Sequence, residues 1–90
     1  MPEARIRLAL ESIAANVRRI RLQKGQTQEG LAHATGLHLT YVQAVERGTR
    51  NLSVGVLVKL AEALHVPPAE LLSPAALAPV QRGRPKTKAV

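Results

Sequence analysis

The apolar residues of the first third of the chain recur at helical spacing. They follow one another in steps of four, three, four and three, which places them on one face of a helix. That face consists of Ile6, Leu10, Ile13, Val17 and Ile20. An alternative takes Ile6, Leu8 and Leu10 as a short strand, with Arg5 and Arg7 facing out. We prefer the helix because it accounts for more residues, and Gly25 supplies its C-terminal stop.

Two short helices are predicted next, joined by a tight glycine turn. Thr27 is a suitable N-cap for the first, because its hydroxyl can accept an unpaired backbone N–H. Gly36 suits the left-handed residue that ends this helix, whereas Gly30 inside it costs about 1 kcal/mol relative to Ala. The second helix runs from about Leu39 to Arg47, and Gly48 closes it. The inward-facing residues of the pair are Leu31, Ala32, Thr35, Val42 and Val45.

Two more helices complete the ordered part of the chain. Ser53 is the expected N-cap of the fourth helix. Its apolar face holds Val56, Leu57, Leu60, Ala61 and Leu64. Pro68 suits the first position of a short fifth helix, from which Leu71 and Leu72 can pack back. Residues 73–90 contain three prolines, four cations and no periodic apolar face, so we expect a mostly disordered tail.

The predicted fold is therefore all-α, with five helices. We divide the chain into an N-terminal extension (residues 1–12, expected to be helical), a helical domain (13–72) and a flexible basic tail (73–90). The hydrophobic fraction is 46%, yet Tyr41 is the one aromatic residue, so the core must be aliphatic.

Several classes of function are disfavoured by composition. The absence of cysteine excludes a disulfide framework and a Cys-based zinc site. The three histidines lack metal-ligand spacing, and the six glutamates are spread singly along the chain. We therefore expect no enzyme, no metal and no cofactor. No apolar run approaches the roughly 20 residues that span a bilayer, and no signal peptide is evident, so a cytoplasmic, nucleoid-associated protein is expected.

The charge is strongly basic and uneven. The net charge is +7, with six Lys/Arg against two Glu in residues 1–24 and four Lys/Arg with no acid in residues 73–90. A balance of this size favours a polyanionic partner, nucleic acid first.

Three blocks of sequence then point to a family. The blocks "NVRRIRLQKGQTQEGLA", "TGLHLTYVQAVERG" and "LVKLAEALHVPPAELL" occur in the order and spacing of the Xre-type, lambda-repressor-like helix-turn-helix regulators. The chain resembles this family over roughly residues 13–72. The resemblance implies a five-helix DNA-binding domain whose second motif helix, the recognition helix, enters the major groove.

The resemblance also implies roles for individual residues. Gln28 is expected to hydrogen-bond a phosphate. The outward positions of the recognition helix are His38, Leu39, Thr40, Gln43 and Ala44. Gln43 is the preferred base reader, since its amide can pair bidentately with adenine, and Thr40 can reach a base or a phosphate. His38 stands where Ser or Thr usually caps the helix, so we expect a weaker cap and a ring that can instead face a phosphate.

The residues around the recognition helix complete this set. Tyr41 either contacts phosphate or covers the helix pair, and the sequence leaves both open. Arg47, Arg50 and Asn51 are expected to contact the sugar-phosphate backbone. By resemblance, Arg21 and Glu46 form a structural ion pair.

The tail holds a further signal in "QRGRPKTK". Its Arg82-Gly83-Arg84-Pro85 resembles the core of an AT-hook, which would lay Arg82 and Arg84, followed by Lys86, along an A·T minor groove. A generic basic tail that adds non-specific affinity is the favoured alternative.

The expected function is a sequence-specific transcriptional regulator, most simply a repressor, that binds double-stranded DNA with a pseudo-palindromic operator as a homodimer. The alternative is an antitoxin or co-regulator that acts mainly through a protein partner, which the apolar Leu39 and Ala44 would suit. Candidate dimer contacts lie on the fifth helix (Val66, Leu71, Leu72) and on the N-terminal extension (Ile6, Leu8, Leu10).

Overall fold

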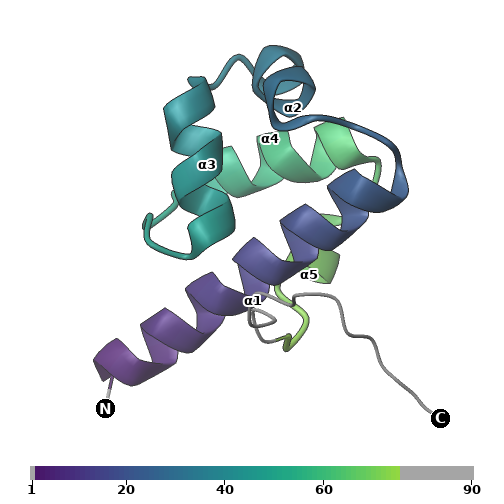
Figure 1. Cartoon of the computed structure of the whole chain (residues 1–90). Coiled ribbons are helices and arrows are strands. Elements are labelled where there is room, and N and C mark those ends of the chain that lie inside the picture. The colour runs from purple at the N-terminus through teal and green to yellow at the C-terminus, as the bar shows by residue number, and fades with distance from the viewer. Residues whose placement is uncertain (1, 76–90) are drawn as a thin grey trace, which may run out of the picture.

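A computed structural model describes residues 2–75, which form five helices. Helix α1 spans Pro2–Gln23, α2 Gln28–Thr35, α3 Leu39–Arg47, α4 Val54–Leu64 and α5 Pro68–Leu71. Helix α1 packs against α3, α4 and α5, while α2 packs against α3 and α4 (Figure 1). The all-α prediction is confirmed. The tail residues proposed for a minor-groove hook, Arg82, Arg84 and Lys86, lie outside the described residues.

Helix α1 is continuous through the region that could have been a strand, so the helical prediction is confirmed. Its apolar face is buried only in part. Ile13, Val17 and Ile20 are buried and Leu10 is half-buried, but Ile6 is 51% exposed. The N-terminal end of α1 extends beyond the other helices (Figure 1), and about half of the Ile6 surface stays exposed. Ile6 therefore shares the apolar face of the buried residues without being buried itself.

The helix ends are formed by local hydrogen bonds. The Thr27 hydroxyl accepts the Gly30 N–H at 2.9 Å, and the Ser53 hydroxyl accepts the Val56 N–H at 3.1 Å. His38 also caps its helix, because its Nδ1 accepts the Thr40 N–H at 3.3 Å. A Cβ on Gly30 would lie 3.2 Å from the Thr27 hydroxyl oxygen, so the missing side chain leaves room for the cap.

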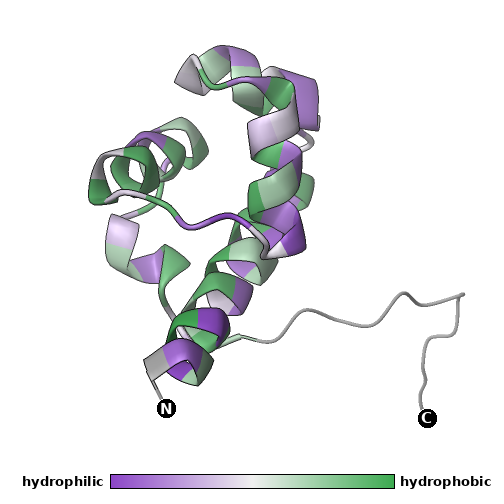
Figure 2. Cartoon of the chain, turned by 90° about the vertical axis from the view of Figure 1, so that its left-hand side faces the viewer, coloured by the Kyte–Doolittle hydropathy of each residue, from purple (hydrophilic) through white to green (hydrophobic). Residues whose placement is uncertain are grey.

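The core is aliphatic, as the composition requires. Hydrophobic and hydrophilic segments alternate along the helices, each of which turns one side inward (Figure 2). The buried hydrophobic residues are Ile13, Ala14, Val17, Ile20, Leu31, Ala32, Val42, Val45, Leu57, Leu60, Ala61, Leu64 and Leu71. Because Leu71 has no exposed surface, it is excluded as a dimer contact, whereas Leu72 is 48% exposed.

The segment after α5 is held to α1 by side-chain hydrogen bonds. The Asn16 amide Nδ2 donates to the carbonyl oxygens of Leu71 and Ser73, both at 2.9 Å. The Ser12 hydroxyl donates to the Ala75 carbonyl and accepts the Ala75 N–H, both at 3.1 Å. Ser12 and Asn16 are themselves buried, so these bonds satisfy their side-chain polar groups together with the backbone groups after α5. They fix α5 against α1.

Candidate nucleic-acid interface

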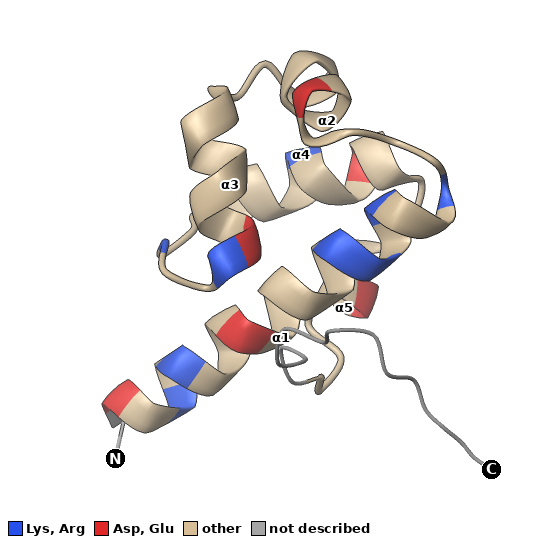
Figure 3. Cartoon of the chain, viewed as in Figure 1, with Lys and Arg blue, Asp and Glu red and all other residues tan. Residues whose placement is uncertain are grey.

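Helix α3 places the proposed base-reading residues at the surface. Thr40 is exposed, and Gln43 and Ala44 are half-buried. The stretch from Leu39 to Val45 contains no charged residue, while blue segments appear along α1 and at the C-terminal end of α3 (Figure 3). The Thr40 hydroxyl lies 2.9 Å from Nδ1 of the exposed His38, so His38 orients Thr40 as well as capping the helix.

Leu39, which is predicted to face outward, and Tyr41, whose role the sequence leaves open, both contact the interior. Leu39 and Tyr41 are half-buried and pack against the hydrophobic core. The Arg50 guanidinium carbon lies 4.8 Å from the centroid of the Tyr41 ring, a cation–π contact that joins the loop after α3 to the helix. The Thr49 hydroxyl donates to the Ala44 carbonyl at 3.2 Å, which holds the start of that loop. Tyr41 therefore covers the core and supports Arg50.

A buried ion pair joins α1 to the end of α3. Arg21 Nε donates to Glu46 Oε2 at 2.6 Å and Arg21 Nη2 to Glu46 Oε1 at 3.0 Å, a bidentate geometry. Arg21 is 8% exposed and Glu46 6%. Arg21 Nη1 also donates to the Gln26 carbonyl at 2.8 Å. Gln28 joins the same network, because its Nε2 donates to Glu46 Oε1 at 3.0 Å.

Beside this ion pair lies an open cleft of about 480 Å³. It is lined by Arg18, Arg21, Gln28, Gln43, Glu46 and Arg47. Sequence reasoning named five of these residues and missed Arg18. Its spacing of three from Arg21 could have identified it, since residues three apart lie on the same face of a helix. A second groove, of about 430 Å³, runs between the start of α2 and α3, and both Leu39 and Gln43 line it.

Asn51 lies apart from this cleft. It is exposed and lines a third groove, of about 260 Å³. The other residues of that groove are mostly apolar: Ile6, Ala9, Leu10, Ile13, Leu52, Ser53, Val54, Leu57 and Leu72. The structure therefore brings together Gln28, Gln43 and Arg47, and it places Asn51 against the exposed apolar surface.

The segment that contains this two-helix unit matches a known family. Residues 17–71 match the family model HTH_3, described as helix-turn-helix. The chain belongs to the Xre-type helix-turn-helix regulators. It is thus a DNA-binding transcriptional regulator, and its family is not one of enzymes.

Individual relatives agree with this membership. The regulator is 49% identical over 57 residues to the control protein C.BamHI of Bacillus amyloliquefaciens, an alignment covering 62% of this chain and 70% of that protein. It is 45% identical to the restriction-modification controller protein C.AhdI from Aeromonas hydrophila, with a TM-score of 0.67 and coverage of 69% and 94%. It is 35% identical to the controller protein C.Esp1396I, solved as a tetramer with its natural 35 base-pair operator (TM-score 0.65, coverage 70% and 83%).

The part of the regulator that the structure describes has no helix both long and apolar enough to cross a membrane.

Proposed function

We propose that the regulator binds a pseudo-palindromic DNA operator as a homodimer, with one α3 in each of two successive major grooves roughly 34 Å apart. The observation that carries this proposal is the order of uncharged polar and cationic side chains along α3 and the loop after it. An uncharged surface that bears the Thr40 hydroxyl and the Gln43 amide is followed directly by Arg47 and Arg50. Hydroxyl and amide groups read base edges, whereas arginines bind the phosphates that border the groove. Such a protein acts at the nucleoid, in the cytoplasm.

Gln28 fits a phosphate contact in this proposal. Its amide nitrogen carries two hydrogens, and the bond to Glu46 uses one of them. The second hydrogen remains to donate to a phosphate oxygen at the edge of the groove. Because Glu46 is itself held by Arg21, the Gln28 amide is oriented before DNA arrives. His38 gives Thr40 a similar orientation at the start of α3.

The apolar groove supports a homodimer. Three large hydrophobic side chains stand on its rim, with Ile6 51% exposed, Val54 76% and Leu72 48%. They come from the start of α1, the start of α4 and the end of α5, so three distant segments form one apolar surface. An exposed surface of this kind marks a protein contact. A dimer doubles the contact with DNA, which a single small domain needs for useful affinity.

In the sequence, the apolar Leu39 and Ala44 suited the antitoxin or co-regulator alternative. Both side chains are half-buried, and Leu39 packs against the core. Neither residue offers a protein partner the exposure of Val54 or Leu72. These two residues therefore do not favour the protein-partner alternative over operator binding.

Base reading is tested by fluorescence anisotropy with a duplex from upstream of the regulator's own gene and with a scrambled duplex, at two salt concentrations. We expect preference for the upstream duplex at moderate salt, and its absence contradicts the operator proposal. Gln43→Ala should lose about 1–3 kcal/mol of discrimination at one base pair. The matched control is Gln23→Ala, since Gln23 is exposed at the end of α1 and lines none of the three clefts. An unaltered base preference in Gln43→Ala would remove Gln43 as a reader.

The dimer is tested by sedimentation equilibrium. Val54→Asp should convert a dimer to a monomer, because a carboxylate would be buried in an apolar contact. The variant should stay folded, since Val54 opens α4 and a carboxylate is favourable in the first turn of a helix. Leu22→Asp is the control, because Leu22 is also exposed (55%) but lies outside this groove. A Val54→Asp variant that remains dimeric excludes this surface as the contact.

A further inference from the structure

The cleft beside the buried ion pair is positively charged. Three arginines and one glutamate line it, and Arg21 and Glu46 neutralise each other within their bidentate pair. Arg18 and Arg47 then leave the cleft cationic, with the amides of Gln28 and Gln43 as additional donors. Both arginines are exposed, and within residues 2–75 neither makes a salt bridge. The cleft is therefore rich in hydrogen-bond donors and lacks an unpaired acid.

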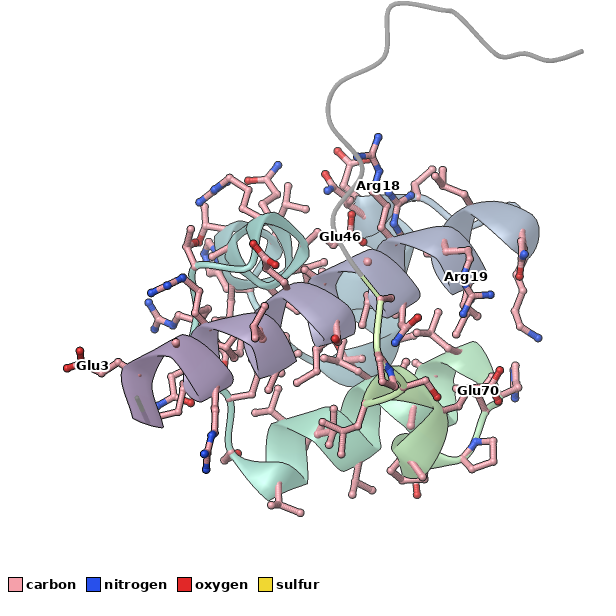
Figure 4. The ribbon with its side chains drawn as sticks, turned by 90° about the horizontal axis from the view of Figure 1, so that it is seen from below. Glu3, Arg18, Arg19, Glu46 and Glu70 are labelled. Carbon is pink, nitrogen blue, oxygen red and sulfur yellow. The ribbon has the colours of Figure 1, made fainter. Side chains whose placement is uncertain are left out.

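Helix geometry determines which of the two neighbouring arginines of α1 lines the cleft. Arg18 lies three residues before Arg21 on the same face of α1, and Arg47 lies four residues after Gln43 on the same face of α3. Arg19 is rotated away from that face, and its Nη2 donates to Asn16 Oδ1 at 3.2 Å. Figure 4 shows Arg18 next to Glu46, whereas Arg19 points in a different direction.

A phosphate-like oxyanion is the ligand that these hydrogen-bond donors suit. The guanidinium group presents parallel N–H donors that match two oxygens of a phosphate, and exposed arginines at a groove edge bind it readily. The cleft contains Gln43, which also belongs to the helix proposed to enter the major groove. The phosphates nearest to a helix in the major groove are those of the DNA backbone along its edge.

We propose that Arg18 and Arg47 bind one backbone phosphodiester of DNA in this cleft, from opposite sides, and that Arg18 is thus a DNA-contacting residue on α1. The inference rests on the proposed function, because it requires α3 to lie in the major groove. Arg18 contributes affinity and fixes the orientation of the domain on DNA without selecting bases. The Arg21–Glu46 pair lines the same cleft.

The salt dependence of DNA binding tests this directly. In Arg18→Gln, the slope of log K against log salt should fall in magnitude by about 0.9 for each bound protomer, and so by about 1.8 for a dimer, because each protomer loses one phosphate contact. The affinity should fall by the same factor on the operator and on the scrambled duplex, so the ratio of the two affinities stays unchanged. Arg18→Lys should keep most of the slope, because it keeps the charge. The matched control is Arg19→Gln, which should leave the slope nearly unchanged. An unchanged slope in Arg18→Gln, or an equal fall in Arg19→Gln, overturns the proposal.

Neutral methylphosphonates placed at the same position of both half-sites, one position at a time, identify the phosphate. One position should weaken binding of the wild-type regulator at least as much as Arg18→Gln does, because that phosphate is bound by both arginines. Adding Arg18→Gln on that duplex should weaken binding no further. Independent losses at every position overturn the assignment. Titration with inorganic phosphate separates a free anion from DNA: saturation of the Gln28 and Gln43 amide NMR signals at low millimolar phosphate would indicate a small-anion site and overturn the DNA assignment.

The failure of this inference is distinguishable from failure of the proposed function. A regulator that shows no operator preference contradicts the proposed function, yet its slope on scrambled DNA still measures the Arg18 contact. Conversely, a preserved operator preference with an unchanged slope in Arg18→Gln removes only the Arg18 contact. Thermal unfolding should be the same for wild type and Arg18→Gln, because Arg18 is exposed.

Discussion

The stability of this domain should depend strongly on the buried pair between Arg21 and Glu46. In Glu46→Ala, the Arg21 guanidinium loses two hydrogen bonds and its counter-charge while only 8% of the residue is exposed. Removing one partner of a buried pair costs about 3–5 kcal/mol, because the other charge is left buried without compensation. Arg21 keeps its bond to the Gln26 carbonyl, so we expect the lower end, about 3 kcal/mol.

That loss is large for a domain of this size. At about 0.05–0.15 kcal/mol per residue, the free energy of unfolding of residues 2–75 is about 4–11 kcal/mol. A loss of about 3 kcal/mol should lower Tm by about 12–24 °C, since each kcal/mol shifts a small domain by about 4–8 °C. Circular dichroism during heating, together with urea unfolding at 25 °C, measures both quantities. Glu62→Ala is the control on the exposed side of α4 and should change stability by less than about 0.5 kcal/mol.

A loss below about 1 kcal/mol in Glu46→Ala is typical of exposed ion pairs, and it would show that burial does not strand the guanidinium. The double variant Arg21→Met with Glu46→Leu sharpens the test. It removes both charges together, so it should lose less stability than Glu46→Ala alone. A double variant less stable than the single one would contradict the desolvation argument.

Three further predictions concern the helix ends, and urea unfolding measures all of them. Gly36→Ala should cost about 1–2 kcal/mol, because Gly36 has φ 74° and only the backbone conformation opposes a side chain there; a neutral result would contradict this. Gly30→Ala should raise the free energy of unfolding by less than the roughly 1 kcal/mol expected from helix propensity, because the new Cβ would lie 3.2 Å from the Thr27 hydroxyl. A gain of the full amount would show that the Thr27 side chain can move aside without cost. His65→Gly should gain about 0.5–1 kcal/mol, since His65 ends α4 at φ 61°, and a loss would reveal a role for its ring.

The local features of this protein followed from its sequence. Helical periodicity identified the five helices, and Thr27, Gly36 and Ser53 marked helix ends through bonds and dihedral angles that involve only nearby residues. The Arg21–Glu46 contact came from family resemblance, since twenty-five residues separate the two and no local rule joins them.

The tertiary structure alone decided which residues of each helical pattern are buried and which surface features they form. Ile6 continues the apolar face of α1, but α1 is longer than the core that it crosses, so Ile6 remains exposed. Leu71 and Leu72 are equivalent in sequence, yet one is fully buried and the other forms part of an apolar groove. Arg18 and Arg19 are neighbours in the sequence, and the packing of α1 against α3 places Arg18 in one cleft with Arg47. Periodicity determines which residues share a face of a helix, and only the packing of the other helices determines what that face meets.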